Sequence, residues 1–142
     1  MDDPCGLQRF LDAQDPVFEQ VLAELRAGRK RSHWIWFIFP QIAGLGLSAM
    51  AQRYAISSLQ DARAYLAHPQ LAARLVECVE LVLAARTSSA EDIFGAVDAM
   101  KFRSSMTLFA EAGPGIPAFR AALEKYFDAR PDPLTLERLR AG

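Results

Sequence analysis

The sequence predicts a single all-α domain of about seven to nine mostly short helices around a long apolar central helix. Three observations predict this fold class. Apolar residues recur at the three- and four-residue spacing of amphipathic helices in most segments. Gly, Pro and cap-forming Ser, Asp or His separate these segments. Only one run favours a strand, and no second convincing strand exists to pair with it.

The length and the composition of the chain predict one globular domain that spans residues 1–142. Such a chain, with 51% hydrophobic and 23% charged residues, can bury a core without disulfides or metals. A net charge of −1 argues against nucleic-acid binding. Cys5 and Cys78 have no metal-ligand or C-x-x-C spacing, so we expect a reduced, cytoplasmic protein. The acidic start and the short apolar runs predict neither a signal peptide nor a membrane span.

Three helices are expected before the first glycine-rich loop. Residues 6–12 form a short one, and Asp15-Pro16 is an N-cap pair for a second that Gly28 ends. Ser32 caps a third, which contains the aromatic run 34–39 and ends at Pro40. The alternative for this run is a buried strand, because Trp, Ile and Phe favour strands.

The middle of the chain contains the central helix. Ser48 caps a short helix through Tyr54, and Ser57 or Ser58 caps the next. His68-Pro69 then begins the longest helix, over residues 69–86. This helix is apolar over most of its circumference, which places it near the centre of the bundle.

The last third predicts four more helices. Ser89 begins a short one that leads to Gly95, and the next covers residues 98–112. Another follows from Pro117 to Arg130, and Asp132-Pro133 caps the last.

The helix over residues 98–112 is the most informative about function. Asp98, Lys101 and Ser105 share one arc beside an apolar arc that includes Phe102 and Phe109. Polar groups so placed are partly desolvated, which is costly unless they are paired or serve a ligand. Both interpretations are open, because Asp98 and Lys101 at i, i+3 can also satisfy each other.

The aromatic run supplies the other candidate residues. In a helix, His33, Phe37 and Gln41 would lie in line, with Trp36 beside His33. His33 could act as an acid or base near neutral pH, and an aromatic ring could stack on a flat ligand. The alternative is that His33 packs or caps and that the aromatic residues belong to the core.

The neighbouring segments add weaker signals. The loop 44–48 could hold an anion on its backbone N–H groups, although it matches no phosphate-binding motif and a tight turn is the alternative. Residues 29–31, Arg-Lys-Arg, are interpreted as a solvated stretch that could also steer an anion. No zinc motif or nucleophile elbow is present, so we expect no metal site and no cofactor.

Three blocks of the sequence resemble a known family. They are SHWIWFIFPQ at 32–41 with GLG at 44–46, the segment AYL-HP-L at 64–71, and SSMTLF at 104–109 preceded by Asp98 and Lys101. They resemble the bacterial domain-of-unknown-function family 1810, over roughly residues 10–126. The resemblance implies a compact helical cytoplasmic domain and supplies no activity. Some members are labelled calpastatin, an inhibitor that is disordered and polar, and this composition is neither.

Two function hypotheses follow. In the first, the domain binds or hydrolyses a nucleotide or another ADP-ribose-like anion, without nucleic-acid or membrane partners. His33, Asp98 and Lys101 would be its catalytic residues, with Asp98 as base and Lys101 as electrostatic stabiliser. Its ligand-binding residues would be Trp36, Phe37, Gln41 and Ser105. The alternative is a non-catalytic protein-interaction module with an exposed apolar patch.

Overall fold

The computed structural model describes residues 3–141, and in that range it contains helices and no strand, apart from one isolated parallel bridge between Ile42 and Ile56. The first five helices are α1 (Gln8–Gln14), α2 (Phe18–Arg26), α3 (Ile35–Ile38), α4 (Ala49–Arg53) and α5 (Leu59–Ala67). The other four are α6 (Pro69–Ala84), α7 (Ala90–Ala112), α8 (Pro117–Phe127) and α9 (Pro133–Ala141). The all-α prediction is confirmed.

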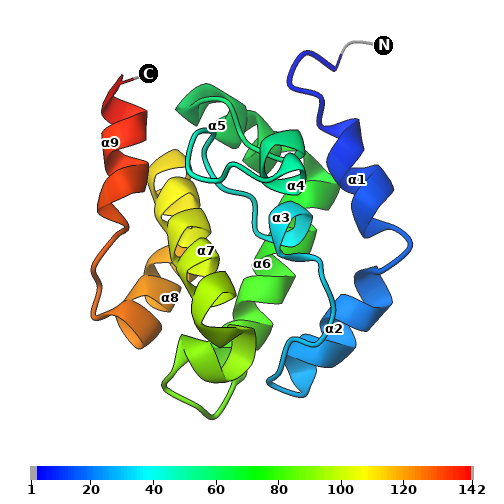
Figure 1. Cartoon of the computed structure of the whole chain (residues 1–142), viewed down its shortest axis with the longest axis vertical. Helices are drawn as coiled ribbons and strands as arrows, with labels where there is room; N and C mark the ends of the chain where they lie inside the picture. The colour runs from blue at the N-terminus through cyan, green and yellow to red at the C-terminus, as the bar shows by residue number, and fades with distance from the viewer. Residues whose placement is uncertain (1–2, 142) are drawn as a thin grey trace.

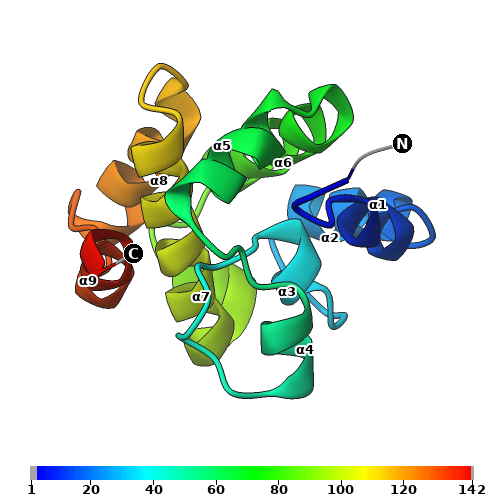
Figure 2. The same ribbon diagram turned by 90° about the horizontal axis from the view of Figure 1, so that it is seen from above.

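Helices α6 and α7 lie at the centre of the bundle. Helix α7 packs against α3, α5, α8 and α9, while α6 packs against α2, α5 and α8. In Figure 1, α8 and α9 lie on one side of α7, and α3 with α1 and α2 on the other. The view from above in Figure 2 shows α7 between α9 and α3. The N-terminal and C-terminal parts of the chain therefore lie on opposite sides of α7.

Helix α7 covers 23 residues and α6 covers 16, but α7 joins two helical segments across Gly95, and the segment after Gly95 is about as long as α6. Gly95 interrupts α7 with a φ of 79°, a backbone angle that glycine adopts without a steric penalty. The predicted division into a short helix before Gly95 and a longer helix after it is therefore present as a kink.

Four predicted N-caps are confirmed. The Asp132 carboxylate accepts a hydrogen bond from the Thr135 backbone N–H in the first turn of α9. The side chains of Ser48, Ser58 and His68 accept hydrogen bonds from the backbone of the first turns of α4, α5 and α6. Two others are wrong. Asp15 does not cap α2, whose N-cap is Val17, and Ser32 does not cap α3, whose N-cap is Trp34.

The aromatic run forms a short helix and enters the core. Helix α3 contains only four residues, because the chain before it is held in a turn described below. Trp34 and Phe39 are buried, and the Phe39 ring lies edge-on to Phe102 of α7 with the ring centroids 4.9 Å apart. Most of the run is thus core, as the alternative interpretation held, and only Trp36 keeps part of its side chain exposed.

Within residues 3–141, none of the helices is both long enough and apolar enough to cross a membrane.

Candidate functional site

The turn before α3 is organised by Glu24, a buried carboxylate on α2. It accepts backbone hydrogen bonds from Arg31 at 2.6 Å and Ser32 at 2.9 Å. It also accepts from the Ser32 hydroxyl at 2.7 Å, from Trp34 Nε1 at 3.0 Å and from Gln20 Nε2 at 3.0 Å. Burial alone would raise the pKa of Glu24, but these hydrogen bonds lower it to about 2. A carboxylate that is ionised near neutral pH therefore fixes the path of the chain into α3.

This turn brings Lys30 to α7. The Lys30 ammonium, whose side chain is only 7% exposed, lies 2.8 Å from Asp98 Oδ2 and donates to the carbonyl of Ser32 at 2.5 Å. It also lies 5.0 Å from the centroid of the Trp34 ring, a cation–π distance. The interpretation of residues 29–31 as a solvated stretch is therefore wrong for Lys30, although Arg29 and Arg31 are exposed.

Asp98 joins two lysines. It is the third residue after the Gly95 kink, in the first turn of a helical segment, where the helix dipole favours a carboxylate. Its other oxygen, Oδ1, lies 3.6 Å from the Lys101 ammonium. The pairing of Asp98 with Lys101 that their spacing allowed is present, but the closer partner is Lys30.

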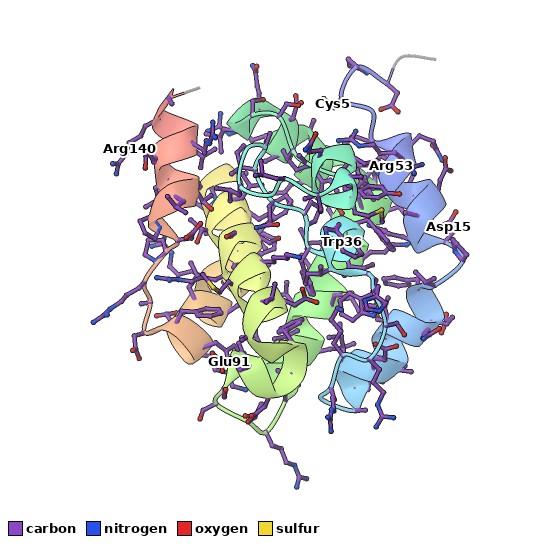
Figure 3. All side chains as sticks on the ribbon, in the orientation of Figure 1. Cys5, Asp15, Trp36, Arg53, Glu91 and Arg140 are labelled. Carbon is purple, nitrogen blue, oxygen red and sulfur yellow. The ribbon has the colours of Figure 1, made fainter. Side chains whose placement is uncertain are left out.

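Lys101 connects this charge cluster to Trp36. The Lys101 ammonium lies 5.4 Å from the centroid of the Trp36 ring, and its side chain is 27% exposed. Figure 3 labels Trp36 on α3, the helix that packs beside α7. We call Lys30, Asp98, Lys101, Trp36 and Ser105 the Lys101 cluster.

Two buried polar atoms of this cluster lack partners. Within residues 3–141, Trp36 Nε1 and Ser105 Oγ are inaccessible to solvent and make no hydrogen bond. Ser105 lies one helical turn after Lys101 and so on the same face of α7. By contrast, the neighbouring Ser104 Oγ lies 3.0 Å from the carboxylate of Asp132. An unsatisfied buried donor costs about 1–3 kcal/mol, so such groups require an explanation.

The other predicted site residues lie apart from these contacts. His33 is exposed in the bend before α3, and within residues 3–141 its side chain makes no hydrogen bond or ion pair. Phe37 is buried against Tyr54, with the ring centroids 5.3 Å apart, and therefore belongs to the core. The carbonyl of Gln41 accepts from the Ile56 backbone at 2.9 Å, beside the isolated bridge. The geometry thus joins Asp98, Lys101 and Trp36.

Glu24 and Lys30 are the residues that sequence reasoning missed. Glu24 offered a signal, because it lies on the apolar stripe of α2 that includes Val21 and Leu25, where an unpaired carboxylate would be costly. The sequence around Lys30 gave no such signal, because its partner, Asp98, lies 68 positions further along the chain. Among residues 3–141, no group of three or more His, Cys, Asp or Glu side chains could hold a metal ion.

The structure defines a small helical domain with a lysine cluster beside a half-buried tryptophan. The chain belongs to the family described as "protein of unknown function (DUF1810)", whose model matches residues 4–139. It is similar to the conserved hypothetical protein Rv1873 from Mycobacterium tuberculosis, known from a 1.38 Å crystal structure. The two are 51% identical over 97% of this chain and 99% of that one, with a TM-score of 0.95. No curated protein matches the chain.

Proposed function

We propose that this protein binds a small anionic ligand, such as a nucleotide or an ADP-ribose-like compound, at the Lys101 cluster. One observation carries the proposal: among residues 3–141, Trp36 Nε1 and Ser105 Oγ are buried without partners on two helices that meet at Lys101. Each atom would regain a hydrogen bond if a ligand supplied an acceptor, which would remove a cost of about 1–3 kcal/mol.

The chemistry of these groups specifies the ligand. An indole N–H and an ammonium group can only donate hydrogen bonds, and a serine hydroxyl can also donate. An acceptor with several lone pairs, such as a carboxylate or a phosphate oxygen, is the kind of group that could accept from each of these donors. The Lys101 ammonium, at 5.4 Å from the indole centroid, would pair with its negative charge.

The geometry favours binding over hydrolysis. A general base must be free to accept a proton from its substrate or from a water. Both oxygens of Asp98 are engaged, one by Lys30 at 2.8 Å and one by Lys101 at 3.6 Å. The Asp98 carboxylate therefore acts in this proposal by holding the two lysines, and His33 has no assigned part.

A second candidate function rests on a separate surface. A groove of about 400 Å³ between α6 and the start of α8 is lined mainly by apolar side chains, including Val76, Leu83 and Ile116. Such a groove is the kind of surface that a protein-interaction module would use. The two functions are separable, because the groove and the Lys101 cluster share no residue.

Thermal unfolding tests the binding proposal. The unfolding temperature is measured with nucleotides, sugar phosphates and ADP-ribose for the wild type, Lys101→Met and the control Arg86→Met, which removes an exposed cation elsewhere. A ligand at a hundred times its dissociation constant adds about 2.7 kcal/mol, or roughly 10 °C. We expect this shift in the wild type and in the control, and its loss in Lys101→Met. Equal shifts in all three proteins, or none in any, would contradict the proposal.

A further inference from the structure

We propose that the group bound at the Lys101 cluster is an oxyanion with a single negative charge, that is, a carboxylate or a phosphodiester rather than a phosphate monoester. This inference rests on the proposed function and narrows its ligand class. Among the ligands named there, it selects those whose phosphates each carry one negative charge, as in ADP-ribose, over mononucleotides and sugar phosphates, which are monoesters. It follows from the charges that the structure joins, from the burial of those charges, and from the partners that each one already has.

The joined side chains carry a net charge of about +1 near neutral pH, because Lys30 and Lys101 are cationic and Asp98 is anionic. A ligand with one negative charge would make the cluster neutral. A phosphate monoester carries close to two negative charges at neutral pH, since its second pKa is about 6. It would leave one negative charge without a partner.

Because the cluster is largely buried, this difference in ligand charge becomes a difference in binding affinity. The side chains of Lys30, Asp98 and Lys101 are 7%, 19% and 27% exposed, so the ligand would lose much of its hydration on binding. The cost of desolvating an ion is several kcal/mol and is recovered only where an opposite charge pairs with it. A second negative charge would have no such partner in the cluster, so it would add cost without an equal gain.

The second lysine is not free to provide that partner. Lys30 is the more buried of the two, and its ammonium already contacts Asp98 at 2.8 Å and the Ser32 carbonyl at 2.5 Å. The contact of Lys101 with Asp98 is longer, at 3.6 Å, and its side chain is the more exposed. Lys101 is therefore the cation that meets the ligand, while Lys30 neutralises Asp98.

The two tryptophans allow a site-specific measurement. The indole N–H of Trp36 lies in the cluster and has no partner in the part of the chain that the structure describes, whereas that of Trp34 donates to Glu24 at 3.0 Å. In a ¹⁵N-labelled protein the Trp36 indole signal would report binding, and the Trp34 signal would be the internal control. A Trp36→Phe variant assigns the two signals.

The titrants are acetate, dimethyl phosphate and methyl phosphate, at constant ionic strength and about pH 8, where methyl phosphate is fully doubly charged. We expect acetate or dimethyl phosphate to move the Trp36 signal, with an affinity at least about tenfold higher than that of methyl phosphate. Tenfold is the smallest effect expected from one uncompensated charge within about 4–6 Å. The monoanion that binds more tightly shows whether a carboxylate or a phosphodiester is the preferred group.

The Asp98→Asn variant tests the same argument from the side of the protein. It raises the net charge of the cluster to about +2, which matches the two negative charges of methyl phosphate. We expect this variant to bind methyl phosphate at least about tenfold more tightly than the wild type does. Equal or tighter binding of methyl phosphate to the wild type would overturn the inference and leave the proposed function standing. If none of the three anions moves the Trp36 signal in the wild type, the proposed function itself fails. Should Asp98→Asn not fold, the wild-type comparison decides alone.

Discussion

Glu24→Gln should destabilise the protein by an amount that depends on pH. The five hydrogen bonds to the carboxylate come from Gln20, Arg31, Ser32 and Trp34, with two of them from Ser32. They favour the ionised form and lower the pKa of Glu24 from 4.5 to about 2. Glutamine has nearly the same shape but no charge, so it imitates the protonated form of the side chain.

The pKa sets the size of the effect. Each tenfold change in proton affinity is worth about 1.4 kcal/mol, so the fall in the pKa corresponds to about 3 kcal/mol. Because the pKa is lower in the folded state, this stability is present above the unfolded value of 4.5 and is lost as the pH falls towards 2. About 2 kcal/mol of it should disappear between about pH 6 and about pH 3.

The assay is urea unfolding of the wild type, Glu24→Gln and the control Glu19→Gln across this pH range. Glu19 is an exposed residue of the same helix, so the control removes the same charge without touching the turn. The difference in free energy of unfolding between wild type and Glu24→Gln should be about 3 kcal/mol at about pH 6 and about 1 kcal/mol at about pH 3. If the difference in free energy of unfolding stays constant over this pH range, the ionised Glu24 carboxylate does not stabilise the turn as we infer.

Three further substitutions test contacts on α7 and at the loop that faces α9. Ser105→Ala should raise the free energy of unfolding by about 1 kcal/mol or more, because it removes a buried hydroxyl that has no partner within residues 3–141. Ser104→Ala should lower it by about 1–2 kcal/mol through its lost bond to Asp132. Urea unfolding measures both changes. Gly44→Ala should cost at least about 1 kcal/mol in the same assay, because Gly44 has a φ of 96°, which alanine adopts only with strain, and the Arg138 guanidinium would have to move aside for the new β-carbon. Equal costs at the two serines, or none at Gly44, would contradict these contacts.

The sequence predicted the helices well where local signals decide them. Ser48, Ser58 and His68 are caps because each can satisfy the backbone of the turn that follows it, which is a property of a few adjacent residues. The prediction failed at Ser32, whose hydroxyl donates to Glu24 instead of capping α3. That competing partner lies on another helix, so no pattern within residues 32–40 could show it.

The candidate site was predicted in part for the same reason. The helical spacing of Asp98, Lys101 and Ser105 placed them on one face of α7, and the structure agrees. It could not show that Lys30 is the closer partner of Asp98, because that contact depends on the turn that Glu24 holds. Nor could it separate Trp36 from Phe37, since a four-residue helix turns one ring towards Lys101 and the next towards Tyr54.

The contrast between Glu24 and the two unpaired atoms is the strongest argument for a ligand. The fold surrounds the Glu24 carboxylate with donors on every side, so this chain can fully satisfy a buried polar group whose role is structural. Within residues 3–141, Trp36 Nε1 and Ser105 Oγ have no partner, although phenylalanine and alanine would fill similar space without the penalty. Both atoms are on helices that meet at Lys101, the most exposed charge of the cluster. An oxyanion at that point would complete the hydrogen bonding that the protein alone leaves open.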